Sequence, residues 1–249
     1  MKIERATTPS AKTAPVLGVE ISLLAMEETL DFIDQRIAAR SLGLIVTADA
    51  TGLMIARRDP EFAEILRQAA LVTPDSAGVV WALKRQGIVA QRVSGVDLVD
   101  RLCARSADHG YRIYFLGAAP GVAERAAERM RLRHPGCNIV GAQHGYFPSE
   151  SDEIVAQQVA EAKPDILFVA MGMPRQEKFI HKIQGIVGAP IAMGVGGSFD
   201  VLSGRTRRAP VLIQKLHAEW LWRLLLNPKK FQKVRELPGF VRAVLKSQR

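Results

Sequence analysis

The chain has 249 residues, of which 48% are hydrophobic and 24% charged, and this composition excludes collagen-like, coiled-coil and intrinsically disordered proteins. Its net charge of +9 is unevenly placed, because residues 205–249 carry twelve Lys or Arg and two Asp or Glu, while the remainder has 22 basic and 23 acidic side chains. The sequence therefore predicts one large, near-neutral body followed by a basic C-terminal segment.

Short apolar runs rich in β-branched residues alternate with stretches of helical periodicity. We expect strands at residues 16–21, 43–47, 71–73, 112–117, 138–142, 165–172 and 190–197. Several runs are continuously apolar, as parallel strands are when crossover helices cover both faces of their sheet. Helices are expected at residues 26–40, 60–70, 76–85, 96–109, 120–133, 151–163 and 174–187, three of them opening with proline. The predicted fold class is α/β, a Rossmann-like, mostly parallel sheet flanked by helices.

After Gly204 the strand signals stop. Residues 211–226 have helical spacing and are apolar over most of the helix circumference, so this helix needs cover on several sides. Beyond Pro228, basic and apolar residues are interleaved, and we expect a break at Pro238-Gly239. We predict a flexible tail over residues 1–15, a core over residues 16–204, and a basic amphipathic helical appendage over residues 205–249.

The sequence also bears on the cellular compartment. The first fifteen residues mix charges and contain no apolar stretch, which argues against a signal peptide. Cys103 and Cys137 lie 34 positions apart without a CxxC motif or a histidine cluster, so we expect neither a disulfide framework nor a zinc site. The longest uncharged run, residues 183–199, holds five glycines and one proline, which suits no membrane-spanning helix. A cytoplasmic protein is predicted.

Polar residues and glycines follow the carboxyl ends of the predicted strands, where ligands of open parallel sheets bind. Glycine allows close backbone approach and helix N-termini supply N–H donors, so this edge suits the phosphates of a nucleotide or sugar nucleotide. A glycine-rich turn between strand and helix can equally be no more than the tight turn that the geometry requires.

Asp75 follows the strand-like residues 71–73 and precedes a helix-like stretch. Its carboxylate can cap that helix, or it can act as a general base at the edge of the sheet. Thr47 and Asp49 carry the same ambiguity, since Thr often ends a strand and Asp often caps a helix. The residues alone leave both interpretations open.

Several motifs are missing from the sequence. The five histidines show no HExxH or other metal spacing, and no Asp-x-Asp is present to hold a diphosphate through a metal. The absence of GxSxG, GxxxxGK[ST] and GxGxxG weighs against α/β-hydrolases, P-loop proteins and dinucleotide-binding enzymes.

Ordered blocks of residues carry a family resemblance. They are Thr47-Ala48-Asp49, Pro74-Asp75, Arg92-Val93-x-Gly95, Phe115-Leu116-Gly117, His144-Gly145-Tyr146-Phe147, Gly172-x-Pro174-Arg175-Gln176-Glu177-Lys178, Gly194-Val195-Gly196-Gly197-x-Phe199-Asp200, Arg208-Ala209-Pro210 and Glu219-Trp220-Leu221-x-Arg223-Leu224. Over residues 16–235, the chain resembles the WecG/TagA/CpsF glycosyltransferases, family 26.

The resemblance implies inverting transfer of a sugar from a UDP donor to a polyprenyl-diphosphate-linked sugar, without a metal or other cofactor. Members of the family transfer N-acetylmannosamine, or its uronic acid, onto N-acetylglucosamine in teichoic acid and enterobacterial common antigen assembly. Others act on hexoses in exopolysaccharide synthesis. We therefore expect an N-acetylmannosaminyl transferase of cell-surface polymer biosynthesis, with a hexosyltransferase as the alternative.

Positions in the blocks imply roles. Asp75 matches the general base, Thr47 a pocket residue needed for activity, Gln176 a residue that contacts the sugar, and Arg92 a residue that faces the diphosphate. Besides Gln176 and Arg92, the expected substrate-binding residues are Asp49, Gly95, Gly117, Gly172, Gly196, Gly197 and Asp200. In the appendage, the residues expected to face the diphosphate or the membrane are Arg223, Arg235 and Arg242. Asp49 and Ser76 depart from the family, which commonly has Asn and Gly there.

The charge distribution agrees with this implication, because a basic, aromatic-bearing segment can bring a protein to a lipid-linked substrate without spanning the membrane. We expect peripheral association with the inner face of the plasma membrane and no nucleic-acid partner, and apolar residues 220–226 make a homo-oligomer an open alternative. The rival classes are a nucleic-acid-binding protein, a non-catalytic interaction protein and another nucleotide-using α/β enzyme, such as a methyltransferase.

Overall fold

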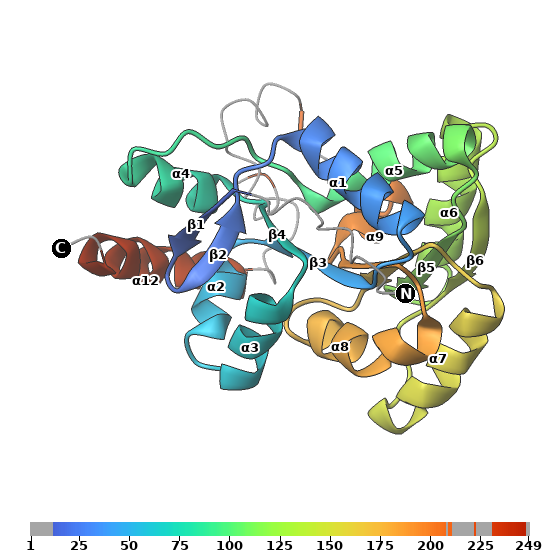
Figure 1. The fold of residues 1–249 in the computed structure, drawn as a ribbon. Helices are drawn as coiled ribbons and strands as arrows, with labels where there is room; N and C mark the ends of the chain where they lie inside the picture. Colours follow the sequence, from blue (N-terminus) through green and yellow to red (C-terminus); the bar gives the residue numbers. More distant parts are fainter. Residues whose placement is uncertain (1–11, 208, 211–221, 223–230, 248–249) are drawn as a thin grey trace, which may run out of the picture.

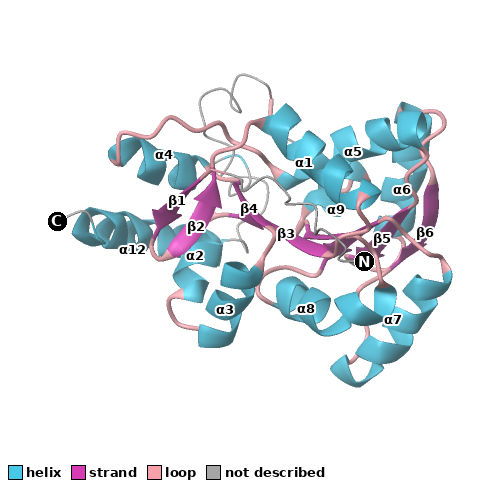
Figure 2. Cartoon of the chain, in the orientation of Figure 1, coloured by secondary structure: helices cyan, strands magenta, loops and turns pink. Residues whose placement is uncertain are grey.

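A sheet of six parallel strands forms the centre of the described part of the chain (Figures 1 and 2). The structure, a computed structural model, describes residues 12–207, 209–210, 222 and 231–247. In spatial order the strands are β4 (Leu71–Pro74), β3 (Gly43–Ala48), β8 (Ile191–Gly194), β7 (Ile166–Ala170), β5 (Ile113–Gly117) and β6 (Ile139–Gln143). All residues of every strand except β6 are buried, as covered parallel strands require. The predicted α/β, Rossmann-like class is confirmed.

Helices cover both faces of the sheet and bury two separate apolar cores (Figure 1). The helices over one core are α1 (Met26–Ala38), α5 (Gly95–His109), α6 (Val122–Arg133) and α9 (Ser198–Leu202). Those over the other core are α2 (Ala50–Ala56), α3 (Pro60–Gln68), α4 (Ala77–Arg85), α7 (Asp152–Glu161), α8 (Arg175–Val187) and α12 (Phe231–Ser247), and a 3₁₀ turn over Ser149–Ser151 precedes α7. Within the described residues, none of the helices is both long enough and apolar enough to span a bilayer.

Proline opens only one of the three helices for which it was expected. Pro60 is the first residue of α3, where its missing N–H costs no hydrogen bond. By contrast, α6 begins at Val122 after a left-handed Gly121, and Pro174 is the capping residue that precedes α8.

The single strand expected at residues 16–21 is in fact a hairpin outside the central sheet. β1 (Thr13–Val16) and β2 (Val19–Ser22) pair antiparallel, and their burial alternates as in a half-solvated ribbon. The chain reverses at Leu17 and Gly18, whose φ angles of 52° and 86° suit a two-residue hairpin loop. Residues 13–15 therefore belong to a strand, so the tail predicted over residues 1–15 is too long.

The break expected at Pro238-Gly239 is also wrong, because α12 continues through Pro238 from Phe231 to Ser247. Packing against the body explains how the helix tolerates a proline. Phe240 and Val244 are buried in the same core as α2 and α4, and a Cβ on Gly239 would lie 3.6 Å from Met54 Cε. The apolar helix predicted over residues 211–226 lies outside the described residues, apart from Trp222.

Candidate functional site

The strand order brings several of the predicted residues to one edge of the sheet. β4, β3, β8 and β7 are consecutive neighbours, and all point the same way. Asp75 follows β4, and Thr47 is the next-to-last residue of β3. Glycine turns, at residues 194–197 and at Gly172, stand at the ends of β8 and β7. Their side chains and amides therefore meet at the carboxyl edge, where parallel sheets bind ligands.

Asp75 is not the cap of the helix that follows it. Ser76 takes that place, since its side chain accepts a hydrogen bond from Val79 N at 3.4 Å. The half-buried Asp75 carboxylate instead reaches the start of α5, where Oδ1 accepts from Gly95 N at 3.3 Å. Its backbone N–H donates to the carbonyl of Ala48 at 3.0 Å, which fixes it against β3. The structure thus holds the Asp75 carboxylate at the carboxyl edge of the sheet, where it bonds to the first residue of α5 and does not cap α4.

Thr47 supports this arrangement from the neighbouring strand. Its buried hydroxyl donates to the Gly194 carbonyl at 3.1 Å, which joins β3 to the end of β8. A Cβ on Gly95 would lie 3.1 Å from Thr47 Oγ1, so only a glycine fits there without displacing its neighbour. We name Thr47, Asp75 and Gly95 the Asp75 cluster.

Gln176, in the first turn of α8, lies beneath the two glycine turns. Its side chain is 0% exposed, and Oε1 accepts from Gly172 N at 3.1 Å and from Gly196 N at 3.0 Å. Nε2 donates to Oε1 of Glu177 at 2.7 Å. The amide thus joins the ends of β7 and β8, and the backbone N–H groups of both glycines are engaged with it. The contact with the sugar that the resemblance implies stays a prediction.

Asp49 and Arg92 flank the Asp75 cluster. The Asp49 side chain accepts from Gly52 N at 2.7 Å and caps α2, which confirms the capping alternative for this residue. Arg92 is half-buried and precedes Val93, whose N–H donates to the Pro74 carbonyl at 3.0 Å. The hydrogen bond of Val93 therefore places Arg92 close to the end of β4, which Asp75 follows. Substrate contacts of both residues stay predictions.

The remaining predicted residues are more scattered. Gly117 ends β5, on the far side of β7, where a Cβ would lie 2.6 Å from the Ala170 backbone. Gly197 precedes α9, and Asp200 within α9 forms an ion pair with Arg205 at 3.9 Å. Within the appendage, Arg242 is exposed on α12, whereas Arg223 and the side chain of Arg235 lie outside the described residues.

The electrostatics of this edge favour an anion. α4, α5 and α8 all begin here, and each helix N-terminus presents a partial positive charge and N–H donors. The described residues contain no group of three or more His, Cys, Asp or Glu side chains placed to hold a metal ion. The arrangement combines a carboxylate able to accept a proton with helix ends able to stabilise a phosphate.

Sequence reasoning missed two features. The first is Glu177, which is fully buried against Gln176. The sequence indicates its burial only in that a second polar residue follows Gln176 on the buried side of an amphipathic helix. The other feature is an open groove of about 900 Å³ between the hairpin and α12, which depends on contacts between distant segments. Its lining residues are Pro15, Leu17, Gly18, Arg57, Arg85, Gln86, Ala243, Lys246 and Ser247.

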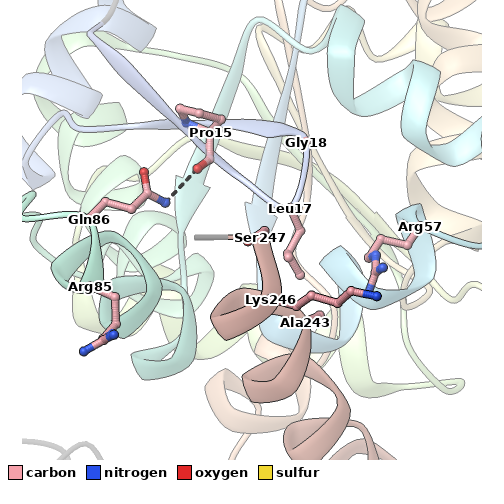
Figure 3. A pocket seen from close by; sticks show the side chains of 9 residues that line it. All are labelled: Pro15, Leu17, Gly18, Arg57, Arg85, Gln86, Ala243, Lys246 and Ser247. Atoms are coloured by element: carbon pink, nitrogen blue, oxygen red, sulfur yellow. Dashed lines mark hydrogen bonds between the residues drawn. The ribbon is translucent and has the colours of Figure 1, made fainter. Parts of the chain in front are cut away.

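We name this second feature the basic groove, because its lining includes three cationic side chains and no acidic one. Figure 3 shows the side chains of Arg57 and Lys246 approaching each other from α2 and α12, beside the hairpin residue Leu17. Gln86 donates to the Pro15 carbonyl at 2.9 Å and fixes the hairpin to the end of α4. The groove therefore brings the like charges of Arg57 and Lys246 together, and an anion would bridge them.

Comparisons with known proteins give a consistent picture. A family model described as the glycosyl transferase WecG/TagA/CpsF family matches residues 14–249. The chain is similar to proteins named N-acetylglucosaminyldiphosphoundecaprenol N-acetyl-beta-D-mannosaminyltransferase. That of Bacillus spizizenii strain W23 is 38% identical over 82% of this chain and 79% of its own length. Those of Bacillus subtilis strain 168 and Staphylococcus aureus strain NCTC 8325 are 32% and 31% identical, over 88% and 94% of this chain and 83% and 92% of their own lengths.

Proposed function

Because this chain belongs to the glycosyl transferase WecG/TagA/CpsF family, we propose that it transfers N-acetylmannosamine from its UDP derivative to polyprenyl-diphosphate-linked N-acetylglucosamine. The names of the similar proteins support this acceptor and this sugar. The observation that carries the proposal is the Asp75 carboxylate, which is held at the carboxyl edge by Gly95 N while Ser76 caps the helix.

In the proposed reaction, Asp75 takes the proton of the acceptor hydroxyl as its oxygen attacks the anomeric carbon of the donor. The new glycosidic bond forms as the bond to UDP breaks, and UDP leaves with the electron pair. Attack opposite the leaving group inverts the anomeric centre. The N-termini of α4, α5 and α8 stabilise the negative charge that develops on the diphosphate. Gly95 N holds the Asp75 carboxylate, and Thr47, which packs against Gly95, supports this residue without exchanging protons.

A transfer assay tests this function. The enzyme is incubated with a short-chain lipid diphosphate bearing N-acetylglucosamine and with UDP-N-acetylmannosamine, UDP-N-acetylglucosamine or UDP-glucose in separate reactions. We expect product from UDP-N-acetylmannosamine, and the same rate after addition of a chelator, because protein N–H groups and cations replace a metal at the diphosphate. Product from UDP-glucose alone would identify a hexosyltransferase instead. Loss of activity with the chelator, restored by Mn²⁺ or Mg²⁺, would contradict the metal-independent mechanism.

We further propose that the basic groove attaches the enzyme to anionic lipid at the inner face of the plasma membrane. Arg57, Arg85 and Lys246 supply the charge, and Leu17 and Ala243 add apolar side chains to the lining of the same groove. This combination of cations and apolar groups is typical of proteins that lie on a bilayer surface. The acceptor, being lipid-linked, lies at the same surface.

Removal of two charges from the basic groove tests this attachment. The double variant Arg57→Gln, Lys246→Gln should bind phosphatidylglycerol vesicles roughly 30-fold more weakly in co-sedimentation, since each basic residue near an anionic surface contributes about 1 kcal/mol. The matched control, Arg125→Gln with Lys163→Gln, removes the same charge from exposed positions elsewhere on the body. Equal losses in both variants would show a non-specific charge effect. Point variants are preferable to truncation after Pro228, because truncation would uncover the core around Phe240 and Val244.

A further inference from the structure

The two cysteines of the chain, 34 positions apart, meet between α5 and the segment that leads into β6. Gly136 and Asn138, on either side of Cys137, both contact α5. A Cβ on Gly136 would lie 3.6 Å from Ala107 Cβ, and Asn138 N donates to Ser106 Oγ at 3.0 Å. Cys103 is one helical turn before Ala107 and so shares its face of the helix. The two thiols are free, lie in the same buried core, and are close enough for each to shift the pKa of the other.

The environment makes the two thiols unequal. The hydrogen bond from Cys103 and the nearby charge of Arg131 lower the pKa of Cys137. The same hydrogen bond, together with burial, raises the pKa of Cys103. Cys137 is 7% exposed and Cys103 is fully buried. Since the thiolate is the reactive form, Cys137 is the nucleophile of the pair and Cys103 is placed to react second.

We propose that Cys103 and Cys137 form a reversible disulfide when the protein meets a hydroperoxide. The Cys137 thiolate attacks one peroxide oxygen, the O–O bond breaks, and the departing hydroxide takes a proton to become water. The sulfur of Cys103 then attacks the sulfenic acid on Cys137, the S–O bond breaks, and a second water leaves. Two thiols thus lose two protons and two electrons, and one hydrogen peroxide is reduced to two waters.

The bond would fasten α5 to the entry of the edge strand β6. α5 is also the helix whose first residue, Gly95, donates to Asp75. Closing a loop between positions 103 and 137 restricts the unfolded chain, so the oxidised protein should unfold at a temperature higher by roughly 5–10 °C. Among the described residues, no third side chain joins the two thiols to make a group that could hold a metal ion.

The test treats the full-length protein with hydrogen peroxide and maps it by mass spectrometry of non-reduced peptides. We expect a single cross-linked pair joining Cys103 to Cys137, a mass lower by about 2 Da, no free thiol by maleimide labelling, and full reversal by dithiothreitol. The melting temperature should rise on oxidation and return on reduction. Intermolecular dimers, sulfinic acid on Cys137 without a cross-link, or two unreacted thiols would each overturn the proposal.

Two single variants separate the roles of the thiols. In Cys103→Ser, Cys137 has no partner and should be trapped as a sulfenic acid by dimedone. In Cys137→Ser, the buried Cys103 should resist the same treatment. If Cys103 were the one labelled, the proposed order of attack would be wrong. Cys103→Ala and Cys137→Ala repeat the comparison without a buried hydroxyl.

Discussion

Replacement of Asp75 by Asn is expected to slow sugar transfer by about 10²- to 10⁴-fold, the usual contribution of a general base. Asn has nearly the same shape and can still accept a hydrogen bond from Gly95 N, but it cannot take a proton from the acceptor. The binding of UDP, measured by calorimetry, should be unchanged within a factor of two or so. Steady-state kinetics with the lipid-linked acceptor give the comparison, in which the loss should fall on kcat.

The neighbouring residue supplies the control for this variant. Ser76→Ala removes the cap of α4 and should lower the free energy of unfolding by about 1 kcal/mol while transfer continues at nearly the normal rate. The proposal predicts opposite patterns, with lost turnover in Asp75→Asn and lost stability in Ser76→Ala. Nearly normal turnover in Asp75→Asn would remove Asp75 from the catalytic step.

The second large effect is expected at Gln176, because its buried amide serves three hydrogen-bonding groups. Gln176→Leu takes from Gly172 N and Gly196 N their acceptor, and from Glu177 Oε1 the hydrogen bond of the amide. Each buried group that loses its partner costs about 1–3 kcal/mol, so the free energy of unfolding should fall by roughly 3 kcal/mol or more. Turnover should fall on the order of 100-fold, because both glycine turns lose their support.

Urea denaturation and kinetics on the same preparation separate positioning from direct contact. If Gln176 acted only by touching the sugar, Gln176→Leu would raise KM and leave the urea midpoint unchanged. Gln184→Leu is a matched control in the same helix, because the Gln184 Nε2 atom is buried without a hydrogen-bond partner. That substitution should leave stability and turnover near normal.

The sheet could be predicted from the sequence because its strands are buried on both faces. Continuous apolar runs such as residues 43–46 and 166–171 indicate strands that are covered on both faces, which is typical of the centre of a parallel sheet. The hairpin could not be separated in the same way, since the residues around Leu17 and Gly18 form one apolar run whose reversal depends on two positive φ angles. The central parallel sheet was predicted correctly, and the first strand was not.

Of the site, the sequence predicts which residues come to the carboxyl edge of the sheet, but not which contacts they make there. Thr47 and Asp75 follow strands that the carboxyl-edge rule brings together, whatever their exact neighbours. Two adjacent residues, Asp75 and Ser76, can both cap α4, and the choice depends on the contact with Gly95, which is distant in sequence. The role of Gln176 depends on β7 and β8 lying side by side, and a single sequence holds no sign of that pairing.

The appendage shows a different limit. Its charge could be read directly from the sequence, but the apolar residues of an amphipathic helix can face either lipid or protein. In α12, Phe240 and Val244 face the protein, while Val241 and Leu245 are exposed. The helix therefore buries one apolar pair against the body and leaves the other pair exposed, a division that its sequence alone does not reveal.

The hydrogen bond between Thr47 and Gly194 also bears on the order in which the molecule is made. It joins residues 147 positions apart. β3 lies between β4 and β8, so its second neighbour is in place only when β8 pairs with it. Contacts of such long sequence separation form slowly, because a long loop must close before they contribute. During synthesis, the chain emerges from its N-terminus, so β3 and β4 must wait for most of the remaining sequence. The carboxyl edge of the sheet is therefore completed only after the ribosome has translated about four-fifths of the chain, on the order of ten seconds or more after β3.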